Sequence, residues 1–176
     1  MIDLPAVLEA VRARSSSQWS YLHGEDHWRR VATNGLDLAA EAGADPVLVV
    51  LFGMFHDSMR LNDGLDGEHG RRGGRLARDL AELLGLPADR LDLLDAACTD
   101  HTHGGTSDDP TIGACWDADR LDLRRLAIRI EPRLMSTAPG RTTTAHERAA
   151  ALLKATPDWP SIFDRLDALR RTREGA

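Results

Sequence analysis

Apolar residues recur along this chain at intervals of three and four, the spacing that places them on one face of an α-helix. The first such stretch covers residues 4–14, and a second starts near Glu25 or Asp26 and ends before Gly43. The same spacing returns over residues 66–84, 88–102, 111–127, 143–156 and 160–172. The pattern predicts a protein built from helices.

The run VLVVLFGMF at residues 47–55 is apolar throughout, so its periodicity cannot separate a buried strand from a buried helix. Asp45-Pro46 in front of it is typical of a helix N-cap followed by proline in the first turn. Because helical segments flank the run on both sides, we predict a helix here too. A serine-rich turn at 15–17 and a loop at 61–67 rich in Asn, Asp and Gly are also expected.

The composition supports an all-α fold. Aromatic residues make up only 5% of the chain, whereas antiparallel strands favour aromatic and β-branched side chains. Leu, Ala, Arg, Asp and Glu are abundant and favour helices. Hydrophobic residues, at 42%, suffice for one core, and no linker divides the chain. We expect a single-domain helical bundle over residues 1–176, in which 139–176 form the C-terminal helices.

Charge and cysteine usage narrow the function classes. The formal net charge of -6 gives the molecule no general attraction to nucleic acid or to an anionic membrane. The N-terminal residues do not have the pattern of a signal peptide, and the longest apolar run is too short to cross a bilayer. Cys98 and Cys115 form no CxxC pair, which argues against a disulfide partner or a thiolate zinc site. We expect a cytoplasmic protein.

Histidine and aspartate residues fall on the apolar faces of the predicted helices. His27, for example, shares a face with Val31, Gly35 and Leu38, and a His-Asp pair ends the apolar run at 47–55. Five helices each carry such a residue, and the set consists of His27, His56, Asp57, His69, His101 and Asp119. Any one of them alone is better explained as a hydrogen-bonded core residue.

Together these six residues point to a buried metal site. Burying several imidazoles and carboxylates without compensation costs several kcal/mol for each group. A divalent cation bound by all of them removes that cost. Imidazole combined with carboxylate suits Fe, Mn, Co, Ni or Zn and is less typical of Ca or Mg.

The order His27, His56-Asp57 and Asp119 resembles the HD-domain metal-dependent phosphohydrolase superfamily. The matching segments are HWRRV at 27–31, FHD at 55–57 and DADRLD at 117–122. Two further histidines, in EHGRRGG and DHTHG, extend the likeness to the six-ligand variant that holds two metals. Within that variant the bacterial diadenosine tetraphosphate hydrolase branch is the most similar. The resemblance covers residues 23–126.

This resemblance implies an all-α bundle with one or two divalent transition metal ions at its centre, Fe or Mn before Co, Ni or Zn. It assigns four ligands to the first metal, which are His27, His56, Asp57 and Asp119. It assigns His69 and His101 to the second metal and makes Asp57 the bridge between the two. The short spacing from Asp57 to His69 leaves an alternative, a one-metal site in which His69 contacts substrate or orients a ligand.

Two nearby residues compete for the ligand positions. His103 competes with His101 but lies past the expected end of its helix, and Asp117 competes with Asp119 but lies off the apolar face. Asp122, one turn beyond Asp119, is expected to orient a ligand instead.

Several neighbours of the ligands are candidates for a phosphoryl-transfer site. Arg30 and Arg60 are the expected catalytic cations beside Asp57, because guanidinium recognises phosphate with two hydrogen bonds. His103 is a candidate to protonate the leaving group.

Two further residues are assigned to substrate binding. Arg72 is a candidate phosphate contact, with a solvated helix face as the equally good alternative. Glu68 is expected to lie beside the site and to orient His69 or His101.

The resemblance implies a hydrolase that uses metal-activated water on a phosphate ester or anhydride. The expected substrate is a small phosphorylated molecule such as a nucleotide. Two alternatives stay open with the same residues, a diiron oxygenase of the HD type and a non-catalytic nucleotide-binding protein.

Overall fold

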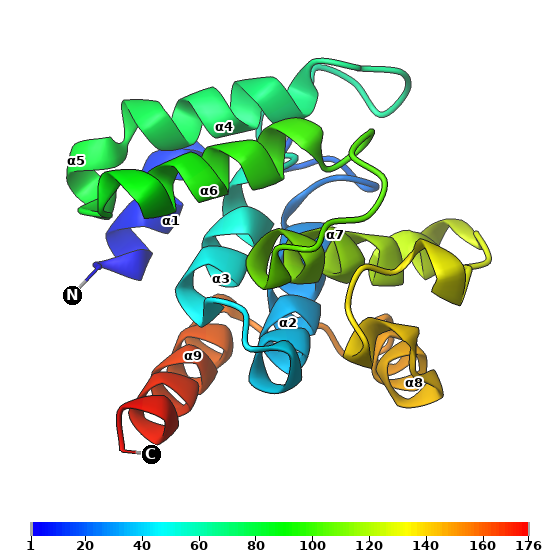
Figure 1. Cartoon of the computed structure of the whole chain (residues 1–176). Helices are drawn as coiled ribbons and strands as arrows, with labels where there is room; N and C mark the ends of the chain where they lie inside the picture. Colours follow the sequence, from blue (N-terminus) through cyan, green and yellow to red (C-terminus); the bar gives the residue numbers. More distant parts are fainter. Residues whose placement is uncertain (1, 176) are drawn as a thin grey trace.

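The structure is a computed structural model that describes residues 2–175. Over that range the chain forms helices and loops and contains no β-strand, which confirms the all-α prediction (Figure 1). The α-helices are α1 (Leu4–Arg14), α2 (Glu25–Ala42), α3 (Pro46–Phe55), α4 (His69–Asp79), α5 (Ala81–Leu84), α6 (Ala88–Asp100), α7 (Pro110–Asp122), α8 (Thr143–Leu152) and α9 (Trp159–Glu174). Three short 3₁₀ turns cover Leu123–Leu126, Pro132–Leu134 and Pro139–Arg141.

The apolar run at 47–55 is the central helix of the bundle. All ten residues of α3 are buried. Asp45 caps the helix through its side chain, which accepts hydrogen bonds from the backbone N–H groups of Val47 and Leu48. Pro46 occupies the first turn, where its missing N–H costs nothing. The helix prediction for this run is confirmed, and it places the His-Asp pair at the end of a rigid buried element.

Three predicted helices are shorter in the structure than the sequence pattern indicated, and one of them is 143–156, where α8 ends at Leu152. The segment 66–84 is not one helix, because α4 begins only at His69 and the backbone leaves helical geometry at Leu80 before α5. The segment 111–127 ends as an α-helix at Asp122 and continues as a 3₁₀ turn. That turn stops at Ala127, whose φ of 57° is left-handed.

The helices pack in two groups around α3. Helix α2 runs beside α3 and is crossed by α7, while α4 and α6 lie side by side over the other end of α3 (Figure 1). Helix α9 is held against the end of α2, since the Arg173 guanidinium donates to the carbonyl groups of Ala39 in α2 and of Ala44 just after it. Among the described residues, none of the helices combines the length and hydropathy that crossing a membrane requires.

Candidate metal centre

Four side chains from α2, α7 and the turn directly after α3 converge at a first buried cluster. The Nε2 atoms of His27 and His56 lie 3.1 Å apart. His27 Nε2 lies 3.5 Å from Asp57 Oδ2 and 3.4 Å from Asp119 Oδ1, and His56 Nε2 is 3.8 Å from each of the same two oxygens. These are the four residues that the resemblance assigns to the first metal.

A second cluster forms around the other oxygen of Asp57. His69, the first residue of α4, places Nε2 3.1 Å from Asp57 Oδ1, and His101, directly after α6, places Nε2 3.7 Å from it. The two Nε2 atoms are 2.9 Å apart. Asp57 therefore presents one carboxylate oxygen to each cluster, which is the arrangement of a bridging ligand.

All four histidines have their outer ring nitrogen occupied. Nδ1 of His27 donates to the Asp122 carboxylate at 2.7 Å, Nδ1 of His56 to the Phe52 carbonyl at 3.0 Å and Nδ1 of His101 to the Cys98 carbonyl at 2.7 Å. Nδ1 of His69 donates to the carbonyl of Asp66. Because these acceptors carry no proton, each Nδ1 holds the hydrogen. When one of these rings is neutral, its Nε2 carries no hydrogen and its lone pair points into the cluster.

This arrangement fits a divalent cation. Two inward lone pairs facing each other at about 3 Å repel unless a proton or a metal ion lies between them, and the facing Nε2 pairs are 3.1 and 2.9 Å apart. Metal–ligand bonds of about 2.1 Å place neighbouring ligand atoms roughly 3.0–3.5 Å apart. The observed spacings between imidazole and carboxylate atoms fall in or close to that range.

Burial sets the protonation of His56, and the surrounding imidazoles set that of Asp57. Burial lowers the pKa of His56 to about 3, so this imidazole is neutral near pH 7. Burial also acts to raise the pKa of Asp57, but the surrounding imidazoles of His56, His101 and His23 outweigh it and hold that pKa well below its usual range. A neutral imidazole and an ionised carboxylate are the forms that bind metal.

The pKa values of His27 and His101 shift the other way, upward. Burial and the charge of Arg125 act to lower the pKa of His27, yet hydrogen bonds with Asp122 and Asp57 raise it. Burial likewise acts to lower the pKa of His101, and Asp57 raises it. The buried carboxylates therefore favour a positive charge beside His27 and His101, and a bound metal ion would supply that charge.

Glycines in the segment EHGRRGG let α4 approach α6 closely enough to form the second cluster. A Cβ atom on Gly70 would lie 2.3 Å from the Cys98 carbonyl oxygen and 2.9 Å from Nδ1 of His101. A Cβ on Gly74 would lie 2.2 Å from Oδ1 of Asp95 on the same helix. At Gly70 a Cβ would meet fixed backbone, so no other residue fits there without moving the helices apart, whereas the atom nearest to Gly74 belongs to a side chain that can rotate. Gly70 therefore brings His69 close to His101.

Behind the first cluster, a buried ion-pair network holds His27. The Asp122 carboxylate accepts from His27 and also from the Arg30 guanidinium, whose Nε and Nη2 lie 2.7 and 3.1 Å from Oδ1 and Oδ2. Arg125 Nη1 lies 3.4 Å from Asp122 Oδ2. The expectation that Arg30 contacts substrate is therefore not supported by its position, since its guanidinium is committed to Asp122. Its geometry is that of a residue that positions a ligand.

Arg60 lies at the second cluster. Its Nη1 is 3.4 Å from Asp57 Oδ1 and 3.0 Å from His69 Nε2, while Nη2 donates to the Gly64 carbonyl at 2.9 Å. The side chain is largely buried. Of the arginines proposed from the sequence to bind phosphate, Arg60 is the one whose guanidinium reaches the metal-ligand atoms.

Three other proposed site residues lie farther from the ligand atoms. Helix α4 starts one residue after Glu68, which leaves the Glu68 side chain exposed and paired with Arg71. Glu68 therefore orients neither His69 nor His101. Arg72 donates to the Met59 carbonyl and pairs with Asp66, which fits a structural role. His103 is exposed in the loop after α6.

Asp117 is not a rival to Asp119 at the metal-ligand cluster. It is fully buried, and its carboxylate accepts from the backbone N–H groups of Ser136 and Thr137 and from the Thr137 hydroxyl. These contacts anchor the segment between the 3₁₀ turns at Pro132–Leu134 and Pro139–Arg141.

His23 contacts the cluster, but helix periodicity did not predict it as a site residue. Its Nδ1 donates to Asp57 Oδ2 at 2.8 Å, and its backbone carbonyl is held by the Trp28 indole N–H at 2.7 Å. Arg125, also not anticipated, fixes the same segment by donating to the Leu22 carbonyl. Both residues lie outside the α-helices, where face periodicity says nothing. The one available signal was the proximity of His23 in sequence to the helix that carries His27.

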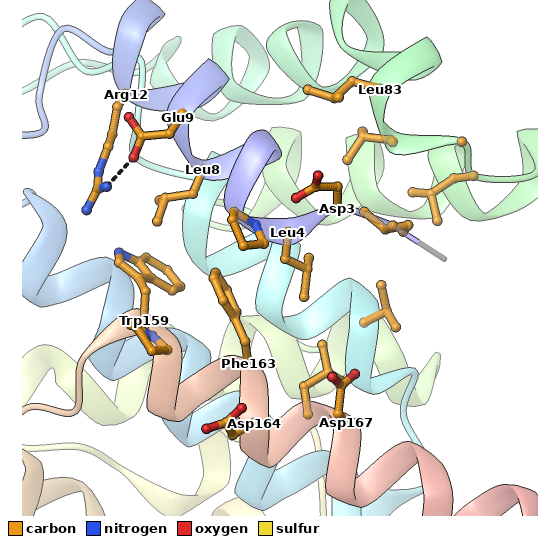
Figure 2. Close-up of a pocket in the computed structure, with 18 of the residues that line it drawn as sticks. Asp3, Leu4, Leu8, Glu9, Arg12, Leu83, Trp159, Phe163, Asp164 and Asp167 are labelled. Atoms are coloured by element: carbon orange, nitrogen blue, oxygen red, sulfur yellow. Dashed lines mark hydrogen bonds and ion pairs between the residues drawn. The ribbon is translucent and has the colours of Figure 1, made fainter.

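A large cleft lies away from the two clusters. It measures about 1210 Å³ and opens between α1, α5 and α9, where Leu4 and Leu8 face Trp159 and Phe163 (Figure 2). None of the residues of the two clusters lines it. The convergence of titratable groups, and not the size of a cavity, identifies the candidate centre.

Comparisons with known proteins bear on the fold. No protein-family model and no curated protein matches the chain. The crystal structure of a predicted HD superfamily hydrolase from an uncultured Thermotogales bacterium is similar, with a TM-score of 0.66 and 22% sequence identity over 86% of this chain and 87% of that one. At this identity the likeness shows the fold. The chain thus has the HD-type helical fold that its motifs predicted.

Proposed function

We propose that this protein is a metal-dependent hydrolase of a phosphate ester or anhydride. The observation that carries the proposal is the shared carboxylate of Asp57, which gives one oxygen to each of two clusters of inward-facing Nε2 atoms. The likeness to a predicted HD superfamily hydrolase supports the same chemistry. Both clusters would hold a divalent transition metal, with Fe or Mn first, and His27, His56, Asp57 and Asp119 form the more complete set.

A divalent ion at these residues supplies Lewis acidity, which makes a water molecule a nucleophile near neutral pH and neutralises phosphoryl oxygens. The chain's own residues then have separate tasks. Asp57 fixes the distance between the two clusters, and Asp122 with Arg30 holds the His27 ring in its metal-binding tautomer. Arg60 offers a guanidinium to the oxygens of the phosphoryl group on which negative charge builds during in-line attack. His103, exposed beyond the second cluster, stays a proposal for protonating the leaving group.

The first experiment is elemental analysis of protein purified without chelator, beside an Asp57→Ala variant. We expect about two Fe or Mn ions per chain in the native protein and loss of both in the variant. The same preparations are then assayed for release of phosphate from nucleotides, dinucleotide polyphosphates and simple phosphomonoesters. Metal-dependent release that Asp57→Ala abolishes supports the proposal.

Other results would contradict it. Protein that binds no metal even after reconstitution returns the histidines to the role of core residues. Metal-loaded protein that consumes oxygen with Fe(II) and hydrolyses no phosphate compound supports a diiron oxygenase, the alternative that uses the same residues. Tight nucleotide binding without product supports a binding protein.

A further inference from the structure

Two loops expose large apolar side chains to solvent. Trp19 and Tyr21, on the loop before α2, are 88% and 93% exposed. Leu61 and Leu65, on the loop before α4, are 70% and fully exposed. The other exposed large hydrophobic residues among the described ones are only 38–47% exposed, so their contacts already cover half or more of each side chain. The four loop residues, which we call the apolar rim, are the unusual ones.

The two loops are joined to each other and to the His-Asp segment. The Ser20 hydroxyl donates to the Asp63 carboxylate, which ties one loop to the other. Ser16 and Ser17 donate through their hydroxyls to the backbone carbonyls of Arg60 and Asp57, both at 2.7 Å. The apolar rim is thus held next to the residues of the candidate metal centre.

The same loop also reaches the metal ligands. His23 follows Tyr21 closely in sequence and donates to Asp57 Oδ2. Its side chain is 12% exposed and that of Asp119 is 19% exposed, whereas the side chains of His27 and His56 are fully covered. Solvent therefore reaches the clusters past Asp119 and past His23, on the loop that carries Trp19 and Tyr21.

A flat aromatic ring matches the chemistry of this rim. Indole and phenol faces stack on nucleobases, and such contacts tolerate any base because each has a π face. A membrane is a poor fit, because the net charge of -6 repels anionic lipid. Because His23 is partly exposed and lies on the loop that carries Trp19 and Tyr21, a substrate whose phosphate lies at the clusters would extend its organic group past His23 toward the rim.

We propose that Trp19 and Tyr21 form a stacking platform for an aromatic base on the substrate, so that the protein selects nucleoside phosphates over phosphates without a base. This inference rests on the proposed function for the position of the phosphate. Leu61 and Leu65 complete the apolar surface around the ring.

The test compares two ligands that differ only by the nucleoside, adenosine 5′-(α,β-methylene)diphosphate and methylenediphosphonate. Their methylene bridge resists hydrolysis, so binding is measured by calorimetry with Mn²⁺ and needs no turnover. We expect the native protein to bind the nucleoside compound more tightly. The Trp19→Ala/Tyr21→Ala variant should lose at least 10-fold of that affinity, since stacking contributes about 5-fold to 150-fold per base. Its affinity for methylenediphosphonate should change less than 2-fold.

A matched control is Leu134→Ala/Leu153→Ala, which removes two partly exposed apolar side chains elsewhere and should alter neither affinity. Fluorescence gives a second readout. The chain has four tryptophans, and Trp28, Trp116 and Trp159 are buried, so accessible emission reports on Trp19. The nucleoside compound should protect Trp19 from acrylamide quenching, and methylenediphosphonate should not.

Equal affinity for both ligands, or unchanged nucleoside affinity in the double variant, overturns the platform. A second result would also overturn it. If, without ligand, Trp19 becomes less accessible to acrylamide as protein concentration rises, and the protein forms a dimer that the double variant does not form, the rim is an interface between two copies of the chain. Failure of the hydrolase proposal is a different result, namely no phosphate release from any compound, and it leaves this binding measurement intact.

Discussion

Asp122 accepts a 2.7 Å hydrogen bond from Nδ1 of His27, and both side chains are almost completely buried. The carboxylate in turn lies between the guanidinium groups of Arg30 and Arg125. Burial acts to raise the pKa of Asp122, but the hydrogen bonds and charges of His27 and Arg30 outweigh it and lower the pKa, so the residue stays ionised. Asp122, which lies outside the proposed ligand set, therefore fixes the tautomer of a candidate ligand.

Asp122→Asn should weaken metal binding at the first cluster by about 10-fold to 100-fold, because the amide no longer supplies the charge that holds His27. Metal affinity measured by competition with a chelating dye checks this. Asp117→Asn is the matched control, since it is a buried aspartate on the same helix that anchors Ser136 and Thr137 instead. It should lower thermal stability and leave metal affinity unchanged. Equal loss of affinity in both variants would show a general effect of folding.

The bridging position of Asp57 predicts unequal losses of metal. Asp57→Ala should remove both ions, whereas His101→Ala should remove one, because His101 contacts only the Oδ1 side of the bridge. Elemental analysis of dialysed proteins, with circular dichroism to confirm folding, measures the stoichiometry. If the native protein holds one ion and the His101→Ala variant keeps it, His69 and His101 are substrate contacts instead of metal ligands.

Gly70→Ala should disturb the second cluster and spare the first. The new Cβ would lie 2.3 Å from the Cys98 carbonyl oxygen, which forces α4 away from α6. Overpacking of this kind costs about 1–3 kcal/mol of unfolding free energy. Gly67→Ala is the control, because a Cβ there meets nothing within 4 Å. Urea unfolding and metal stoichiometry are measured for both variants, and indistinguishable results would reject the role of close helix packing.

Arg60→Met should raise KM for phosphate substrates by about 10-fold to 100-fold, the worth of a hydrogen bond to a charged group. Arg60→Lys should recover part of the loss, since ammonium keeps the charge but not the planar fork. Arg75→Met, on an exposed face of α4, should have no effect. Steady-state kinetics on all three variants checks this, and an unchanged KM in Arg60→Met would place phosphate binding elsewhere.

Helix faces predicted much of the fold and the identity of the inward-facing residues. His27 lies on a periodic helix, and the His-Asp pair ends a buried run, so their position in the core followed from sequence spacing alone. The same reasoning was wrong for Asp117, which was expected off the apolar face of its helix and is fully buried. Their convergence did not follow from spacing, because it depends on the angle at which α7 crosses α2 and on the contact of α4 with α6. The resemblance to the HD-domain superfamily supplied that step.

The partners of the arginines and of His23 could not be predicted in the same way. Arg30 is one helix turn from His27, and only the crossing of α7 shows that its guanidinium pairs with Asp122. His23 lies before its helix, where the backbone path is set by tertiary hydrogen bonds such as that from Trp28. Glu68 was misplaced for a related reason, since a shift in the start of α4 turns a predicted inward residue into an exposed one.

The clustered side chains come from segments spread between residues 23 and 122, and they meet only when α2, α3, α4, α6 and α7 are all in place. An unfolded chain holds no such site, so the free energy of metal binding adds to the free energy of folding. A free metal concentration 100 times Kd would stabilise the native state by about 2.7 kcal/mol. If the proposed metal binds, the melting temperature of this protein should rise with the free metal concentration, and a chelator should lower it.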